Sequence, residues 1–573
     1  MHDTATIRIR ALSALILIAS LVFIGKLFFI QVIHGGDYRE QASRQYISPV
    51  SNIFDRGNIF FTKKDGQTLS AATLKTGFTV AINPTLLEDP QGAFAHLVSI
   101  IPDIDSDAFF LKAGKKNDPY EEIARRVPKD KAQAVESLDI QGVSIHEEKW
   151  RFYPGKTLAA HVLGFVGYDG DRQVGQYGLE RYYDYTLRRD EKDAEINLFA
   201  EVFANIRNSF LYQGGARAGD IVLTIEPDVA AFLGRQVEDI RETWNAESAG
   251  AIIMDPMTGA VIAMESSPTF NPNSFSDVAD YSVFSNPLVE SVFEMGSIVK
   301  PLTVAAGLDA GAIVPTDTYY DPGFVEVSGA RIENFDGKGR GRVPLQEILN
   351  QSLNTGAVHV EQKLGKERFR SYFRALGLQE ETGIDLPNEA SGLAENLESS
   401  RDVEYATASF GQGFAVTPIS IARALSALGN GGVLVTPYVV SRIDFKEALS
   451  RDMTHNPSLY PRVYKKETSE TITRMLVTVV DKALVGGTVK LEHYSVAAKT
   501  GTAQIARRDG KGYYEDRYLH SFFGYFPAYA PRFLVFLYIE NPRGVRFASE
   551  TLTHPFMDTV KFLIHYYGIP PDR

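Results

Sequence analysis

Residues 250–265 read GAIIMDPMTGAVIAME, in which two apolar runs flank the turn-forming residues at 256–259. Short apolar runs separated by proline and glycine are typical of two β-strands joined by a tight turn. Strand-like runs return near the C-terminus at 495–505, 520–527 and 532–539. The pattern therefore predicts that the first hairpin and the last strands share one sheet.

The stretch between these strands is helical and rich in loops, and the chain closes on a predicted helix at 555–567. There Phe556, Val560, Leu563 and Tyr567 recur at helical spacing. Strands at both ends with helices between them favour a mixed α/β fold, in which one sheet is flanked by helices. Such a sheet brings residues from the two ends of this region together.

The composition excludes several classes of site. The chain has 573 residues, a net charge of -12 and no cysteine. The length predicts two or three domains. Lys and Arg are not clustered, so no nucleic-acid partner is expected. The lack of cysteine excludes disulfides and thiolate chemistry, and the histidines show no metal-binding spacing.

Residues 11–33, ALSALILIASLVFIGKLFFIQVI, form an almost continuous apolar run. Roughly 20 apolar residues suffice to cross a bilayer as a helix. Arg8 and Arg10 precede the run and favour a cytoplasmic tail at 1–10. A cleaved signal peptide is the alternative, but the run is long and no small-residue cleavage site follows it. We expect a single-pass membrane anchor, with the rest of the chain outside the cytoplasm.

The region 34–240 mixes short strand-like runs, at 77–83 and 221–225, with a charged helical pattern at 129–137. No cluster of chemically reactive residues stands out in it. We interpret it as a spacer or interaction domain, and we place the candidate chemistry in a second domain, 241–573.

The first candidate group is Ser297 with Lys300, within FEMGSIVKPLTVAAGL. Residues three apart share one face of a helix. A serine hydroxyl is a weak nucleophile until a base takes its proton, and burial or a nearby cation can lower the pKa of a lysine enough for that role. Pro301 indicates that a helix begins close by. Taken alone, the pattern is better explained by a helix-capping serine and a surface lysine.

Two further groups follow. Ser352 could relay a proton, and the amide of Asn354 could hold Lys300 or a substrate carbonyl, although either residue alone would suit a turn. The segment Lys499–Thr502, within SVAAKTGTAQI, is expected on a strand. Lys499 could bind a substrate carboxylate and act as the second cation near Lys300. Gly501 would let a ligand lie against the strand, and a backbone N–H there could join that of Ser297 in an oxyanion hole.

In this order, the motifs S-x-x-K, S-x-N and K-T-G resemble those of the penicillin-binding protein and serine β-lactamase superfamily. The segments DPMTG at 255–259 and FGQG at 410–413 are also similar to that superfamily. RGNI at 56–59 and RFYP at 151–154 resemble the pedestal of class B penicillin-binding proteins. The resemblance covers nearly the whole chain. Met295 departs from the family, which often has proline there.

The resemblance implies a membrane anchor, an elongated α+β pedestal and a transpeptidase domain with an antiparallel sheet flanked by helices. It implies that Ser297 attacks a peptidoglycan stem peptide ending in D-Ala-D-Ala, and that β-lactams trap the same acyl-enzyme. Lys300 would be the base, Ser352 the proton shuttle and Asn354 the orienting group. The carboxylate and the oxyanion would be bound by Lys499, Thr500, Gly501 and Thr502. No metal or organic cofactor is implied.

The implied partners are a polytopic membrane glycosyltransferase and other proteins of cell-wall synthesis. The S-x-N form of the second motif and the compact C-terminal region favour a role in division, with elongation and cell shape as the alternative.

Other members of the superfamily share the motifs. A class A β-lactamase would carry a Glu-x-x-Leu-Asn segment after Ser352, and none is present. A bifunctional protein would need glycosyltransferase motifs, which the region 34–240 lacks. A D,D-carboxypeptidase would use water as acceptor, and the large N-terminal region argues against it. An inert scaffold or a β-lactam-binding receptor stays open, although all three motifs are intact.

Overall fold

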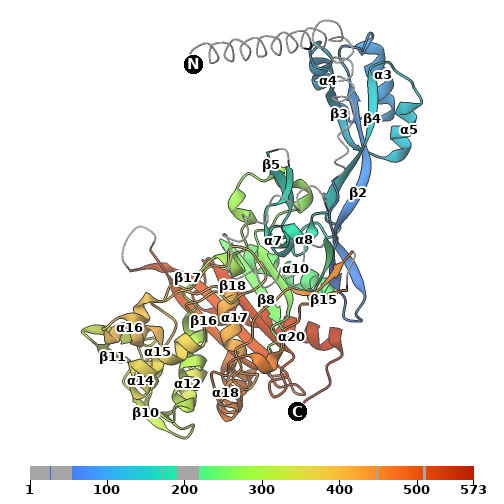
Figure 1. Ribbon diagram of the computed structural model, residues 1–573. Coiled ribbons are helices and arrows are strands. Elements are labelled where there is room, and N and C mark those ends of the chain that lie inside the picture. The colour runs from blue at the N-terminus through green and yellow to red at the C-terminus, as the bar shows by residue number, and fades with distance from the viewer. Residues whose placement is uncertain (1–25, 27–53, 171, 190–217, 447–448, 508–511) are drawn as a thin grey trace, which may run out of the picture. The chain divides into compact units, whose positions relative to one another are not determined.

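The computed structural model describes residue 26 and residues 54–170, 172–189, 218–446, 449–507 and 512–573 (Figure 1). The predicted tail and membrane segment lie outside these residues, except for Lys26. Among the described residues, no helix has both the length and the apolar character needed to span a membrane. The described chain forms two compact units: a smaller one with residues 74–150 and a larger one with residues 56–73 and 151–573.

The smaller unit packs three helices beside strands that pair with the later part of β2. Its strands are β2 (Thr68–Ile82), β3 (Glu121–Val127) and β4 (Val143–Phe152), and its helices are α3 (Pro90–Ile100), α4 (Ser106–Ala113) and α5 (Lys129–Glu136). Asp89 begins α3 by accepting the N–H of Gly92, and a proline follows at the first helical position. These elements confirm the strand predicted at 77–83 and the helix predicted at 129–137.

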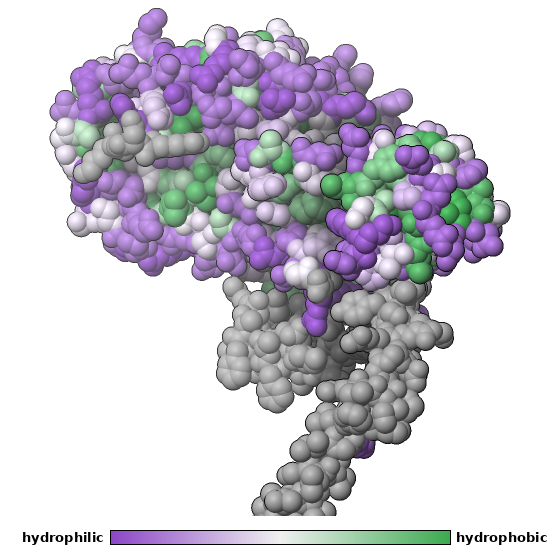
Figure 2. All heavy atoms as spheres, turned by 90° about the horizontal axis from the view of Figure 1, so that it is seen from above, coloured by the Kyte–Doolittle hydropathy of each residue, from purple (hydrophilic) through white to green (hydrophobic). Residues whose placement is uncertain are grey.

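The surface of the smaller unit exposes several large apolar side chains (Figure 2). They are Leu86, Phe110, Leu111, Tyr120 and Leu138. Phe110 lies edge-on to the buried Phe109, with ring centroids 5.4 Å apart, so part of this surface continues the core of the unit.

The larger unit is built on a five-stranded antiparallel sheet with the order β16-β17-β18-β8-β9 (Figure 1). Its strands are β8 (Ser248–Met254), β9 (Val261–Ser267), β16 (Ala497–Ala506), β17 (Tyr513–Phe526) and β18 (Phe533–Glu540). The turn between β8 and β9 closes with the N–H of Asp255 donating to the carbonyl of Ala260. The predicted hairpin and the pairing of early with late strands are therefore confirmed.

Two helices pack on this sheet and on each other. They are α10 (Pro227–Thr243) and the closing helix α20 (Thr553–Tyr567), which confirms the predicted C-terminal helix. Phe232 of α10 stacks on Phe562 of α20 with ring centroids 4.0 Å apart. Phe556 of α20 stacks on Phe522 of β17 at 4.3 Å. One half-buried ring pair thus joins the two helices, and one buried ring pair joins α20 to the sheet.

Further helices and two small hairpins lie between β9 and β16 in the chain. The helices are α11 (Pro287–Glu290), α12 (Lys300–Asp309), α13 (Gln346–Asn350), α14 (Asn354–Leu364), α15 (Lys366–Ala375), α16 (Asp402–Ala408), α17 (Pro418–Ser426) and α18 (Lys466–Thr478). The hairpins pair β10 (Thr318–Asp321) with β13 (Gly341–Pro344) and β11 (Phe324–Val327) with β12 (Ala330–Glu333).

A second set of strands in the larger unit joins distant parts of the chain. It includes β1 (Ile59–Thr62), the start of β2, β7 (Gly219–Leu223), β14 (Val440–Phe445) and β15 (Arg451–Asp452). The strand β7 occupies most of the run predicted at 221–225. The short elements before it are α6 (Ala160–Leu163), β5 (Val166–Asp169), β6 (Arg172–Gly175), α7 (Gly178–Tyr182) and α8 (Asp184–Leu187).

A buried ionic cluster ties the RGNI and RFYP segments together within the larger unit. Arg56 and Arg151 each donate to Glu180 at 2.6 Å, and Arg56 also pairs with Asp184 at 2.8 Å. Both side chains of the Arg56–Glu180 pair are fully buried. The predicted domain boundary at residue 240 stays a prediction. The larger compact unit combines residues 56–73 with 151–573, and the helix α10 continues through residue 240.

Candidate active site

Ser297 lies in a single 3₁₀ turn, Gly296–Val299, which leads directly into α12. Pro301 occupies the first turn of α12, as predicted, because proline needs no N–H donor there. Gly296 has a φ of +63°, and a Cβ atom at this position would lie 2.6 Å from the carbonyl oxygen of Thr502. Only glycine therefore allows the segment that carries Ser297 to lie against β16.

Lys300 is completely buried at the start of α12. Its Nζ donates to the carbonyl oxygen of Ser352 at 2.5 Å and to the hydroxyl of Ser352 at 3.2 Å. Burial, and after it the charge of Lys499, hold the pKa of Lys300 well below its ordinary value. The amine thus has the lowered pKa that a general base needs near neutral pH, and it contacts the hydroxyl of Ser352, a group through which a proton could pass.

The corner that carries Ser352 is conformationally strained. Ser352 has a backbone φ of +55°, a value that residues other than glycine rarely adopt. Such strain is typical of sites where the surroundings hold a residue in place for function. Asn354 begins α14, and its Nδ2 donates to the carbonyl oxygen of Glu333 at 2.8 Å. The orienting contact of Asn354 with Lys300 stays a prediction, since the amide nitrogen is engaged by Glu333.

The third group lies on β16, as predicted. Lys499 is 3% exposed, its Nζ donates to the carbonyl oxygen of Thr500 at 2.9 Å, and burial lowers its pKa to about 7. Gly501 was expected to leave room for a ligand against the strand, but the structure gives another reason for a glycine at this position. A Cβ atom there would lie 2.4 Å from the Ser521 hydroxyl and 2.7 Å from the carbonyl oxygen of Met295. The absence of a side chain at Gly501 therefore makes room for the segment 295–298, which contains Ser297.

Thr502 connects β16 to the next element. Its Oγ1 accepts the N–H of Ala548 at 3.1 Å, at the start of α19 (Ala548–Thr551). Thr500, like Thr502, is half-buried on β16. The roles of Thr500 and Thr502 toward a substrate carboxylate stay predictions.

The fold thus brings the three motifs to one place, although they are far apart in sequence. Lys300 contacts Ser352, the charge of Lys499 acts on Lys300, and Gly296 lies against Thr502. A serine hydroxyl at a helix start, a buried amine of lowered pKa, a second hydroxyl and a second lysine are groups that suit acyl transfer. Among the described residues, no group of His, Asp and Glu is arranged to hold a metal ion.

Comparison with known protein families agrees with this geometry. Residues 249–560 match the "Penicillin binding protein transpeptidase domain", and residues 54–201 match the "Penicillin-binding Protein dimerisation domain". The chain belongs to the class B penicillin-binding proteins.

Similar curated proteins cover most of this penicillin-binding protein. It is 31% identical over 565 residues to "Stage V sporulation protein D" of Bacillus subtilis, covering 97% of this chain and 85% of the relative. It is 27% identical over 453 residues to "Peptidoglycan D,D-transpeptidase FtsI" of Escherichia coli, covering 78% and 73%.

Solved structures show the same fold. Penicillin-binding protein 3 of Mycobacterium tuberculosis in complex with aztreonam aligns with a TM-score of 0.64 at 26% identity, covering 74% of this chain and 92% of that one. Penicillin-binding protein 2X of Streptococcus thermophilus aligns with a TM-score of 0.72 at 19% identity, covering 90% and 81%, and this likeness concerns the fold alone.

From the sequence we did not predict a role for a half-buried carboxyl beside the Ser297 turn of this penicillin-binding protein. Glu294 lies three residues before Ser297 and accepts the hydroxyl of Tyr513 at 3.0 Å. Burial raises the pKa of Glu294 to about 7. A glutamate next to a serine motif is no signal by itself, because its partner lies more than two hundred residues away and only the fold brings the two together.

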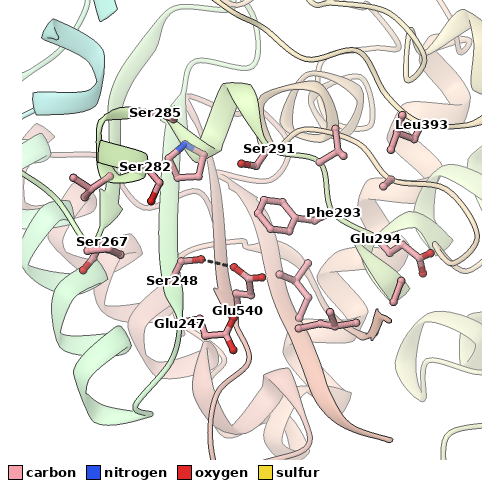
Figure 3. Close-up of a pocket in the computed structure, with 18 of the residues that line it drawn as sticks. Glu247, Ser248, Ser267, Ser282, Ser285, Ser291, Phe293, Glu294, Leu393 and Glu540 are labelled. Carbon is pink, nitrogen blue, oxygen red and sulfur yellow. Dashed lines mark hydrogen bonds between the residues drawn. The ribbon is translucent and has the colours of Figure 1, made fainter. Parts of the chain in front are cut away.

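A cavity of about 1050 Å³ extends from this region along the end of the sheet (Figure 3). Glu294, Phe293 and Leu393 line one part of it, while Ser248 donates to Glu540 at 2.8 Å on another. None of the eight predicted site residues lines this cavity. The predicted catalytic residues therefore lie outside its lining, although the segment before Ser297 forms part of its wall.

Proposed function

We propose that this penicillin-binding protein is a peptidoglycan D,D-transpeptidase that uses Ser297 as its nucleophile. One observation carries the proposal: fully buried Lys300, whose pKa is well below its ordinary value, contacts Ser352 within the site that contains Ser297 and Lys499. The match to the transpeptidase family supports the same chemistry.

In the first half-reaction, neutral Lys300 accepts the proton of the Ser297 hydroxyl as its oxygen attacks the penultimate carbonyl of the donor stem. The backbone N–H groups of Ser297 and Thr502 stabilise the oxyanion. The peptide bond to the last D-Ala then breaks, and the leaving amine takes a proton through Ser352. Lys499 binds the terminal carboxylate during this step.

In the second half-reaction, an amine of a neighbouring stem attacks the ester carbonyl of the acyl-enzyme. Its proton passes to the same relay, and the Ser297 oxygen leaves and is reprotonated. The product is an amide cross-link, and the free enzyme is regenerated. When a β-lactam ring opens on Ser297, the lactam C–N bond breaks but the freed nitrogen stays attached to the acyl group. It therefore does not leave the site as D-Ala does, and the adduct blocks the approach of an acceptor.

The substrate half of the proposal is tested with a thioester mimic of the donor stem and a D-amino acid as acceptor. We expect release of the thiol and formation of the new amide, both lost in Ser297→Ala. Thiol release with hydrolysis alone, at saturating acceptor, would instead indicate a carboxypeptidase. A protein that neither turns over the thioester nor is acylated would be an inert scaffold, and one acylated without turnover would be a β-lactam receptor.

We assign the enzyme to cell division. The S-x-N form of its second motif and its similarity to transpeptidases named FtsI support this role. The alternatives are elongation and cell-shape maintenance. Depletion separates them, because loss of a division enzyme gives filaments, whereas loss of an elongation enzyme gives rounded cells.

The proposed location is the bacterial cytoplasmic membrane, with the anchor at 11–33, the tail at 1–10 inside and the catalytic unit outside. The apolar run and the flanking Arg8 and Arg10 support this orientation. A polytopic membrane glycosyltransferase and other cell-wall proteins are the proposed partners. Protease accessibility of the catalytic unit in spheroplasts tests the orientation, and digestion only after membrane lysis would contradict it.

A further inference from the structure

The carboxylate of Asp321, at the end of β10, lies at the centre of a buried network beside the Ser352 corner. Asp321 is 1% exposed. It accepts five hydrogen bonds, whose donors are the N–H of Gly323, the Nδ2 of Asn334 twice, the N–H of Arg340 and the hydroxyl of Thr355. All four donor groups are uncharged. A buried anion held in this way is costly to disturb, because each lost donor leaves the charge less compensated.

The network connects the Ser352 corner to the loop 334–340. Thr355 follows Asn354 at the start of α14, and its hydroxyl donates to Asp321 at 2.8 Å. Asn334 donates to both oxygens of Asp321 at 3.0 Å. Next to it, the carbonyl of Glu333 accepts the amide of Asn354 at 2.8 Å. Asp321 therefore holds Thr355, which follows Asn354 in the chain. It also holds Asn334, which follows the residue whose carbonyl accepts the amide of Asn354.

The same loop has a second connection to the corner. The Nε of Arg340 donates to Gln351, the residue before Ser352, at 3.1 Å, and its guanidinium pairs with Asp336 at 2.8 Å. The backbone N–H of Arg340 is one of the four donors to Asp321. Both ends of the loop are thus tied to the corner through the Asp321 carboxylate.

The loop also contacts the strand side of the site. The ring of Phe335 packs edge-on against that of Phe547, with centroids 5.6 Å apart. The residue after Phe547, Ala548, donates its N–H to Thr502 of β16 at 3.1 Å. The ring contact consequently links the loop whose neighbour Glu333 binds Asn354 to the segment that binds Thr502.

We propose that Asp321 is a positioning residue for the acylation step. Its carboxylate holds the loop 334–340 and the Ser352–Thr355 corner in one arrangement, so that Ser352 and Asn354 face Ser297 and β16 correctly. This inference rests on the proposed function and extends it to a residue that touches neither Ser297 nor Lys300.

The test compares Asp321→Asn with Asp317→Asn in the full chain. Asp321→Asn keeps the shape but removes the charge and turns one acceptor into a donor that faces N–H groups. Asp317 is exposed in the same region and accepts the N–H of Val314 at 2.9 Å, so its substitution is a matched control. Benzylpenicillin is the probe, and stopped-flow kinetics separate the first-order acylation constant from the affinity of the initial complex.

We expect Asp321→Asn to lower the acylation constant about ten- to hundredfold, because hydrogen bonds to a charged group are lost. The initial affinity should change far less, and Asp317→Asn should match the wild type. A merely structural role would lower the melting temperature and the fraction of active protein but leave the acylation constant of the folded fraction unchanged. That result would overturn the proposal.

Thr355→Val serves if Asp321→Asn does not fold, because it removes one donor and no charge. A smaller fall in the acylation constant supports the proposal, and a wild-type constant overturns it. Wild-type protein that benzylpenicillin and the stem thioester both fail to acylate would refute the proposed function instead. The two failures are therefore distinguishable.

Discussion

Lys300 and Lys499 are buried in one site, and after burial itself the charge of Lys499 is the next influence that lowers the pKa of Lys300. Lys499 is itself affected, since burial lowers its pKa to about 7. Two ammonium groups cannot both be accommodated easily in a buried site, so one amine is favoured in the neutral form. The charge of the neighbouring lysine lowers the pKa of Lys300 in addition to burial, so the lysine beside the Ser297 turn is the one we expect to be neutral.

Removing the charge of Lys499 should raise the pKa of Lys300. A base acts in its neutral form, so acylation rises as the pH rises through the pKa of Lys300. In Lys499→Gln we expect this limb of the profile to move to higher pH, by on the order of one unit. Lys499→Arg keeps the charge and should keep the limb in place, even if binding weakens. An unmoved limb in Lys499→Gln would contradict the coupling.

Gly296→Ala should destabilise the larger unit and prevent acylation. The added Cβ atom would lie 2.6 Å from the Thr502 carbonyl oxygen, in addition to the strain of a φ of +63°. We expect a loss of roughly 2–4 kcal/mol in unfolding free energy. Gly311 has the same φ of +63° with nothing within 4 Å, so Gly311→Ala measures the strain alone. Equal losses in the two variants would mean that close packing on β16 is unimportant.

Glu180→Gln should be strongly destabilising, because it leaves Arg56 and Arg151 buried without their shared counterion. A loss of about 3–5 kcal/mol is expected in thermal or urea unfolding. Glu122→Gln removes a partner of Arg125 in an exposed pair and should cost less than about 1 kcal/mol. A loss in Glu180→Gln no larger than in this control would contradict the role of the cluster.

The effect of Glu180 should also depend on pH. Burial raises the pKa of Glu180, but Arg151 and Arg56 lower it by more, so the net shift is downward. A carboxyl with a lowered folded pKa stabilises the protein above its unfolded pKa and loses that contribution as the pH falls. The difference in stability between wild type and Glu180→Gln should therefore shrink in acid, below the ordinary glutamate pKa of about 4.3.

Local sequence predicted the sheet because its strands are short apolar runs bounded by turns. The hairpin β8–β9 and the helix α20 lie where their patterns place them. The run predicted at 520–527 begins within β17, which already starts at Tyr513, because apolar residues dominate only from about His520. The early part of β17 carries charged and half-exposed side chains, so it lacks the apolar signal of a strand.

The sequence allowed us to predict the residues of the site that belong to the three motifs. Lys300, Ser352 and Lys499 meet as expected, because the sheet joins the chain's early and late segments. The acceptor of Asn354 and the atoms that exclude a side chain at Gly501 are backbone groups with no sequence signature. Asp321 was missed for the same reason, since uncharged donors up to 34 residues away surround it.

The most direct test of the account is the intact mass of the purified protein after incubation with a penicillin. We expect one stable adduct with the mass of one penicillin on the wild type and none on Ser297→Ala. An adduct of equal extent on Ser297→Ala would show that Ser297 is not the nucleophile and would contradict the assignment of the site.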